Sequence, residues 1–290
     1  MADLSGVNLA MQTPFNQDGS IHYATTEALI DQYIEAGVHG LVLGSGTGQH
    51  PYLTEAECMR FYELGAKRIN GRCNLICQTS ALNGDEVIRR SRHAESVGAN
   101  ALMVLPPYLE GPTDDDGLFD FYAELDAAIG IDIVGYNIPQ ATHIAVSVPL
   151  LKRLGSLKNF NYIKDSGGDL AVQQGYLQTG VKVLNGADPI AVYALMAGAV
   201  GAIWGAANYM PQEAVALYRL VQAKDYAGAL ALWQRMLPSQ LLIWKENYIP
   251  NVIKAAQIRG MGTGYVRKPL RGLNAAQEAV LREALAPLGA

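Results

Sequence analysis

The chain has 290 residues, of which 50% are hydrophobic and only 17% are charged, and its net charge is -5. The fraction of charged residues is below the usual value of about a quarter, so many apolar residues are available for a large core. The low charge also favours an oligomer that buries apolar surface between subunits. The acidic balance, without any block of Lys or Arg, argues against a nucleic-acid or anionic membrane partner and therefore predicts a small-molecule partner.

Cysteine and histidine usage favours neither a disulfide scaffold nor a zinc site. Cys58, Cys73 and Cys77 form no CxxC pair and have no zinc-type spacing to the five histidines. Residues 1–6 lack the basic and apolar stretches of a signal peptide, and three glycines interrupt the apolar segment 190–207, so we expect a helix and a strand there rather than a membrane span. These features predict a reduced, cytoplasmic setting without a metal ion or a membrane partner.

Short apolar runs alternate with helical patterns along most of the chain. We expect strands at residues 7–13, 40–43, 74–79, 101–105, 132–136, 162–164, 181–184 and 201–204. We expect helices at residues 25–36, 54–69, 84–97, 118–129, 148–154, 170–178, 190–197 and 211–222, where Thr54 and Glu57 have the spacing of a capping box. Strict alternation of strand and helix indicates a parallel sheet, and eight units match a closed (β/α)8 barrel, the TIM barrel.

The last part of the chain has helical patterns at residues 227–237, 240–259 and 275–285 and no further strand pattern. We therefore expect a barrel of residues 1–224 that carries the active site, followed by a C-terminal helical extension of residues 225–290 that packs on the barrel. A doubly wound sheet, the other common architecture for alternating elements, would place a GxGxxG motif after its first strand, and the chain has none there.

In such barrels the chemistry collects at the carboxyl ends of the strands, and a lysine ends the sixth one. Lys164 follows the run 160–163 and precedes a turn at residues 165–168. Burial at the rim of a core favours the neutral, nucleophilic form of an amine, whereas a solvated, inert lysine is the alternative. Tyr136 ends the fifth strand, where its phenol either points into the barrel mouth or is a buried tyrosine satisfied by one hydrogen bond.

The second strand ends in a glycine-rich turn at residues 44–50. Successive backbone N–H groups in Gly46, Thr47, Gly48 and Gln49 can form a nest for an anion, and the hydroxyl of Thr47 adds a donor. A carboxylate would fit there. The alternative is a tight turn that uses glycine only for its backbone freedom.

The seventh and eighth strands end in further candidate site residues. Gly186 permits close approach of a ligand, and Asp188 either accepts hydrogen bonds from hydroxyl groups or caps the next helix. Ile203 and Trp204 are expected to form a wall of the pocket. An amine, a phenol and an anion nest at one rim are the groups that imine chemistry on a 2-oxo acid requires.

Several motifs, in this order, resemble the dihydrodipicolinate synthase/N-acetylneuraminate lyase family of class I aldolases. They are residues 13–15 (TPF), 46–49 (GTGQ), 105–108 (LPPY), 136–139 (YNIP), 163–166 (IKDS), 185–188 (NGAD), 249–256 and 264–270. The resemblance covers nearly the whole chain. It implies that Lys164 forms a Schiff base with a 2-oxo acid such as pyruvate, that Tyr136 relays protons and that Thr47 helps to hold the carboxylate. It also implies a homotetramer, and no cofactor beyond the covalent imine.

Three positions depart from the family members that condense pyruvate with aspartate semialdehyde. Gly46 replaces the first threonine of a Thr-Thr pair, Leu109 replaces a tyrosine that reaches the neighbouring subunit's site, and Ala141 replaces an arginine that binds the semialdehyde carboxylate. We therefore rank 4-hydroxy-tetrahydrodipicolinate synthase activity below other activities of the family.

Ser166 and Asp188 match the N-acetylneuraminate lyase branch of the family, and both can bond to substrate hydroxyl groups, whereas Pro189 and Gln49 replace its acidic residues. The sequence therefore predicts retro-aldol cleavage of a small hydroxylated 2-oxo acid, such as a 2-keto-3-deoxy acid, with release of pyruvate. Dehydration or deamination through the same imine is the close alternative. A non-catalytic 2-oxo-acid-binding protein is a further one.

Overall fold

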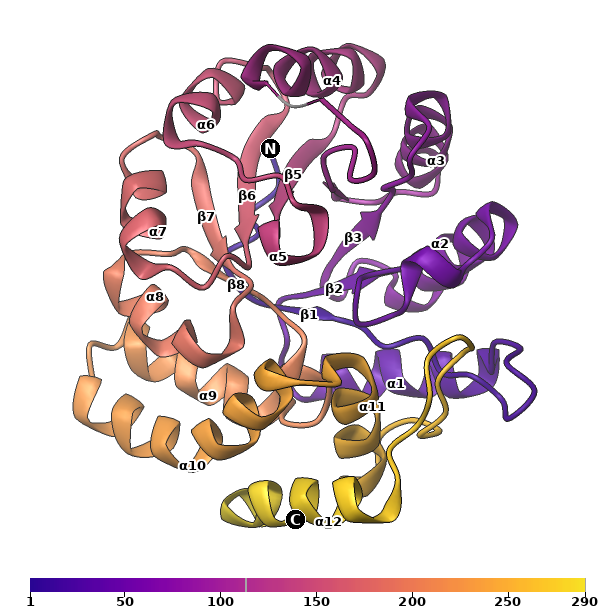
Figure 1. Ribbon diagram of the computed structural model, residues 1–290, viewed down its shortest axis with the longest axis vertical. Helices are drawn as coiled ribbons and strands as arrows, with labels where there is room; N and C mark the ends of the chain where they lie inside the picture. Colours follow the sequence, from indigo (N-terminus) through magenta and orange to yellow (C-terminus); the bar gives the residue numbers. More distant parts are fainter. Residues whose placement is uncertain (113, 290) are drawn as a thin grey trace.

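The computed structural model, which describes residues 1–112 and 114–289, confirms the TIM barrel (Figure 1). The strands pair in chain order, neighbours run parallel, and β1 pairs with β8, so the sheet closes on itself. The strands are β1 (Gly6–Ala10), β2 (Gly40–Leu43), β3 (Asn74–Gln78), β4 (Ala101–Val104), β5 (Asp132–Asn137), β6 (Phe160–Asp165), β7 (Lys182–Asn185) and β8 (Gly201–Trp204).

Helices surround the strands, and Figure 1 shows α10 to α12 together beside α9 and α1. The α-helices are α1 (Tyr23–Glu35), α2 (Glu55–Ile69), α3 (Gly84–Ser96), α4 (Asp115–Ala128), α5 (Pro139–Thr142), α6 (Val148–Leu154), α7 (Leu170–Leu177), α8 (Ala191–Ala197), α9 (Pro211–Gln222), α10 (Tyr226–Lys245), α11 (Tyr248–Ile258) and α12 (Ala275–Leu285). Thr54 and Glu57 form the expected capping box at the start of α2. Among the helices so described, none is long and apolar enough to cross a membrane.

Two apolar clusters explain why the strands are buried on both faces. The larger cluster lies between the sheet and the helices, and a smaller one fills the barrel interior with side chains such as Val42, Met103 and Leu184. The N-terminal segment covers one end of the barrel, where Leu4 is fully buried and the hydroxyl of Tyr162 donates to the carbonyl of Ala2 at 2.6 Å. The opposite end, at which the strands finish, is left for the site.

Several observed strand ends differ from the expected ones. The first strand was expected to reach residue 13, but β1 ends at Ala10, because the N–H of Gln12 donates to the side-chain oxygen of Asn208 at 2.9 Å instead of to a neighbouring strand. β6 begins at Phe160 rather than at residue 162, and β7 lies one residue later than expected.

The C-terminal helices also differ from the expectation. A break was expected between residues 237 and 240, yet α10 continues through Pro238 to Lys245. A proline inside a helix costs about 3 kcal/mol, and the buried face formed by Trp233, Met236 and Ile243 offsets that cost. The interruption between the two helices lies instead at Asn247, which has a left-handed φ of 49°. α10 packs on α9, α11 and α12, and the division of the chain at residue 224 remains a prediction.

Candidate active site

A cavity of about 700 Å³ opens at the carboxyl ends of the strands. Its walls come from the turn after β2, from the ends of β5, β6 and β7, and from Gly205 after β8. Trp244 at the end of α10 and Tyr248 and Ile249 at the start of α11 close it from the C-terminal side. A cavity of this volume holds a small metabolite.

Lys164 and Tyr136 lie side by side in this cavity because their strands are paired. The parallel register of β5 and β6 sets Tyr136 opposite Lys164, and the amine lies 3.9 Å from the centre of the tyrosine ring. Lys164 is 5% exposed and Tyr136 is 6% exposed. Among the residues that the structure describes, Lys164 has no carboxylate partner, so the amine remains available for a ligand.

A buried polar network fixes the end of β6 behind the lysine. Asp165 accepts hydrogen bonds from the side chain of Asn137 at 2.8 Å and from the N–H of Gly167 at 3.0 Å. Burial raises the pKa of the Asp165 carboxyl, and these hydrogen bonds act in the opposite sense. The network joins β5 to β6 and so holds the two cavity side chains in register.

Gly186, the residue after β7, allows Lys164 to adopt its position. A Cβ atom at this glycine would lie 2.7 Å from Cε of Lys164 and 2.3 Å from Oγ of Ser166. Both distances are well below ordinary contact, so no larger residue fits without displacing them. The hydroxyl of Ser166 donates to the carbonyl of Gly186 at 3.0 Å, which ties β6 to β7 beside the amine.

The turn after β2 offers unpaired donors to the cavity. Within the described residues, no acceptor is bonded to the N–H of Gly46 or Thr47 or to the hydroxyl of Thr47, and both residues line the cavity. Successive free N–H groups form the kind of concavity that binds an anion. A Cβ atom at Gly46 would meet nothing within 4 Å, so the cavity is wider at the position where the resemblance led us to expect threonine.

His50, which begins a short 3-10 helix (His50–Tyr52) after this turn, contributes a neutral wall. Desolvation lowers the pKa of His50 to about 3, with Arg90 and Lys164 acting in the same sense. One ring nitrogen, Nδ1, lies 3.0 Å from the side-chain nitrogen of Gln78. His50 therefore adds no positive charge near neutral pH. Among the described residues that line the cavity, Lys164 is the only lysine or arginine.

Asp188 lies behind the cavity wall, and its carboxylate is hydrogen-bonded to protein groups rather than exposed to the cavity. Its carboxylate is fully buried and accepts hydrogen bonds from the N–H of Ala206 at 3.0 Å and from the hydroxyl of Tyr248 at 2.9 Å. Burial raises the pKa of Asp188 to about 6, although the two hydrogen bonds and Lys164 act in the opposite sense. Neither of the two expected roles, hydroxyl recognition and helix capping, describes these bonds.

The structure brings six of the ten predicted site residues to the cavity wall: Lys164, Tyr136, Gly46, Thr47, Ser166 and Gly186. The other four, Gly48, Gln49, Asp188 and Ile203, do not line it. Gly48 bonds to Ser45 and Thr13, Gln49 accepts from the N–H of Arg267 at 3.1 Å, and Ile203 belongs to the apolar filling of the barrel. Gly48, Gln49 and Asp188 bond to other parts of the chain, and the side chain of Ile203 lies in the barrel interior, so all four support the wall from behind.

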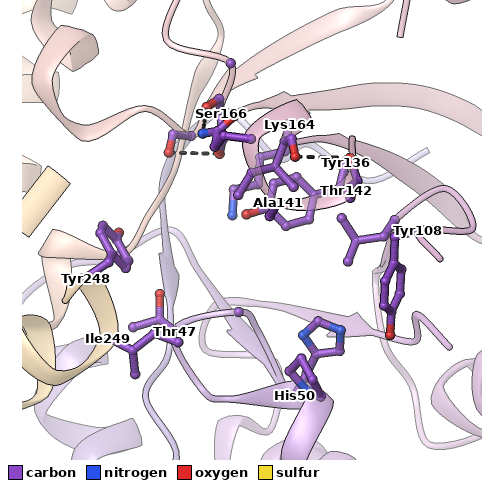
Figure 2. A pocket seen from close by; sticks show the side chains of 18 of the residues that line it. Thr47, His50, Tyr108, Tyr136, Ala141, Thr142, Lys164, Ser166, Tyr248 and Ile249 are labelled. Carbon is purple, nitrogen blue, oxygen red and sulfur yellow. Dashed lines mark hydrogen bonds between the residues drawn. The ribbon is translucent and has the colours of Figure 1, made fainter. Parts of the chain in front are cut away.

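Tyr52, Trp244 and Tyr248 are among the cavity residues that the sequence analysis did not single out. Figure 2 shows Tyr248 and Thr47 on one side of the cavity and Tyr136 on the other, with Lys164 between them. Tyr248 follows Lys164 by more than eighty positions and lies on a helix outside the barrel, so no local pattern connects the two. The described residues contain no group of three or more His, Cys, Asp or Glu side chains that could hold a metal ion.

Comparisons with known proteins agree over the whole length of the chain. A sequence model of the Dihydrodipicolinate synthetase family matches residues 3–287. The 4-hydroxy-tetrahydrodipicolinate synthases of Acidiphilium cryptum and Nitrobacter hamburgensis are 33% and 31% identical to it, over 98% of this chain in both cases and over 98% and 96% of their own lengths.

The chain is also similar to solved structures of dihydrodipicolinate synthases. Dihydrodipicolinate synthase from Aquifex aeolicus is similar with a TM-score of 0.93 and 27% identity over 98% of both chains. The chloride-inhibited dihydrodipicolinate synthase from Acinetobacter baumannii, solved in complex with pyruvate, has a TM-score of 0.93 and 27% identity over 99% of both chains.

Proposed function

Because the chain belongs to the dihydrodipicolinate synthetase family, we propose that it is a lyase that forms an imine between Lys164 and a small 2-oxo acid and cleaves a hydroxylated 2-oxo acid to pyruvate and an aldehyde. The observation that carries the proposal is the buried amine of Lys164, which lies in the cavity 3.9 Å from the ring of Tyr136 and has no carboxylate partner within the described part of the chain. A desolvated amine next to a phenol is suited to attack a carbonyl and to exchange protons with the product.

The proposed cleavage can be written as balanced steps that use only these residues and water. The amine of Lys164 condenses with the C2 carbonyl, releases water and gives an iminium ion. When the C3–C4 bond breaks, its electron pair forms an enamine with the iminium, and the proton of the C4 hydroxyl passes to a base for which Tyr136 is placed. Return of a proton to C3 and hydrolysis of the imine release pyruvate and restore the lysine.

The free N–H groups of Gly46 and Thr47 and the hydroxyl of Thr47 support carboxylate binding at one end of the cavity. Away from this turn the cavity is lined by Leu105 and Ile138, and no arginine lies among its described lining residues. A second carboxylate would lose its hydration there without gaining a charged partner. We therefore propose an aldehyde fragment that is uncharged.

The core of the proposal is tested by incubating the protein with pyruvate and borohydride and measuring the intact mass. One pyruvyl adduct per chain is expected, and none in Lys164→Ala. The absence of an adduct, or an adduct that persists in Lys164→Ala, would contradict the imine. A panel of 2-keto-3-deoxy acids then separates cleavage, which yields pyruvate and an aldehyde, from dehydration or deamination, which do not. Stabilisation by pyruvate without turnover of any of them would favour a binding protein.

A second candidate, 4-hydroxy-tetrahydrodipicolinate synthase, is supported by the names of the curated relatives. It requires a site for the carboxylate of aspartate semialdehyde, and Ala141 lies at the mouth of the cavity where the resemblance implies an arginine. The two candidates differ in one measurement. Consumption of pyruvate with aspartate semialdehyde faster than with uncharged aldehydes of similar size would support the second candidate against the first.

A further inference from the structure

The carboxylate of Asp188 and the hydroxyl of Tyr248 form a buried acid–phenol pair, here called the Asp188–Tyr248 pair. Oη of Tyr248 lies 2.9 Å from Oδ2 of Asp188, and Oδ1 of Asp188 accepts from the N–H of Ala206 at 3.0 Å. Asp188 comes from the turn after β7, Ala206 from the turn after β8 and Tyr248 from the start of α11. The pair therefore connects the C-terminal helices to the catalytic end of the barrel.

Tyr248 is placed at the end of the cavity where the substrate carboxylate is proposed to bind. Gly205 shows this, because a Cβ atom built on it would lie 2.0 Å from Oη of Tyr248 and 2.9 Å from Oγ1 of Thr47. The two hydroxyl groups thus meet over the same glycine. Figure 2 shows them on one side of the cavity, facing Lys164. A carboxylate held by Thr47 would lie within reach of the phenol.

The phenol of Tyr248 has a single proton, and its direction decides whether Tyr248 favours or disfavours binding of the substrate carboxylate. When Asp188 is ionised it can only accept, so Tyr248 donates to it and presents lone pairs to the substrate carboxylate. When Asp188 is protonated, the acid can donate to the phenol oxygen, and the phenol proton is free to point into the cavity. Only the second arrangement adds a donor to the anion site.

We propose that the Asp188–Tyr248 pair binds the carboxylate of the 2-oxo acid together with one proton, which is taken up by Asp188 and allows Tyr248 to donate to the substrate. This inference deepens the proposed function and rests on it for the position of the carboxylate. Tyr248 is then a substrate-binding residue, and Asp188 is the positioning residue that sets the direction of its hydrogen bond.

The surroundings of the pair are consistent with proton uptake near neutral pH. Burial raises the pKa of Asp188 to about 6, and the ammonium of Lys164 acts against this rise. Burial also holds the pKa of Tyr248 well above its usual value, so the phenol keeps its proton. The other ionisable groups that face the pair or lie on helices packed against its turn are Tyr136, Tyr209, Tyr193, Tyr226, Arg235 and Lys245, and none of them is hydrogen-bonded to Asp188.

The experiment is calorimetry of pyruvate binding to the full chain between pH 5 and pH 8, in buffers of different ionisation heat, so that protons taken up on binding are counted. The apparent affinity of the unsubstituted protein should fall up to about tenfold between pH 5 and pH 7, as the protonated fraction of Asp188 falls. Asp188→Asn should take up about one proton fewer and show a nearly flat pH profile, because its amide always donates to Tyr248. Tyr248→Phe should bind weakly at every pH.

Asp225→Asn makes the same chemical change at the exposed N-cap of α10 and should behave as the unsubstituted protein. The measurements are repeated in Lys164→Ala, where no imine can form, so the proton of the pair is counted apart from imine chemistry. Equal proton uptake in Asp188→Asn and the unsubstituted chain, or no saturable pyruvate binding in any form, would overturn the inference. A missing borohydride adduct with normal proton uptake would instead overturn only the proposed function. Melting curves confirm that each variant is folded.

Discussion

Replacement of Gly186 by alanine is expected to disable Lys164 without unfolding the barrel. The added Cβ would lie 2.7 Å from Cε and 3.0 Å from Cγ of Lys164, and 2.3 Å from Oγ of Ser166. Because carbon atoms in contact are separated by about 3.5–4.0 Å, Cε has to retreat by about 1 Å. An error of about 1 Å in the position of a reacting group can lower the rate about a hundredfold, or by about 2.7 kcal/mol in the barrier.

The assay is the rate at which borohydride traps the pyruvyl adduct at subsaturating pyruvate, followed by intact mass. Gly84→Ala is the matched control, because a Cβ at this first residue of α3 meets nothing within 4 Å. The side chain of Lys164 is flexible, so the thermal midpoint of Gly186→Ala should fall only a little. A variant that melts like the unsubstituted protein and traps pyruvate at its rate would refute the reasoning.

Three further predictions concern an ion pair, the mouth of the cavity and the core. Arg267→Ala should lower the free energy of unfolding by about 1–3 kcal/mol in urea titrations, because Arg267 donates to both carboxylate oxygens of Glu57 at 2.8 and 2.7 Å. Arg267 lowers the pKa of Glu57, so this stabilisation is fully present above the unfolded pKa of 4.5 and is lost as the pH falls through the folded pKa. The free energy of unfolding should therefore fall less steeply with acid in Arg267→Ala than in the unsubstituted chain, and equal slopes would contradict this. Ala141→Arg should lower the KM for a carboxylate-bearing aldehyde about tenfold relative to an uncharged one, and an unchanged ratio would show that the mouth does not contact the aldehyde. Phe160→Ala should destabilise the chain by about 3–5 kcal/mol, because its buried ring packs edge-on against Tyr122 with centroids 5.1 Å apart; a smaller loss in urea would mean that the barrel wall collapses into the cavity left by the ring.

The fold could be predicted from the sequence because each unit of the barrel has its own local signal. Apolar runs mark the strands, and capping residues such as Thr54 mark helix starts. Lys164 and Tyr136 could be placed at one rim for the same reason, since all parallel strands of a barrel end on the same side. The helix through Pro238 could not be predicted, because the packing of α10 rather than its local preference decides where it ends.

The rest of the site depends on tertiary contacts that no local pattern shows. The sequence places a carboxylate at Asp188, but it does not show that Ala206 and Tyr248 use the oxygens of that carboxylate. Gln49 likewise lies in the predicted turn, yet it binds the backbone of Arg267 far along the chain. Local patterns therefore identified the residues on the strands, and only the folded chain shows which of them line the cavity.

The sheet closes only where β1 pairs with β8, so the barrel cannot close before residue 204 has been synthesised. Lys164 emerges before Gly201–Trp204, so this lysine is present for some time in a chain whose sheet is still open. Tyr248 emerges later still. A truncated chain that ends before α11 would keep all eight strands and the lysine, yet it would lack the wall that Tyr248 and Ile249 provide. The wall of the cavity is therefore complete only when α11 has joined the eight strands.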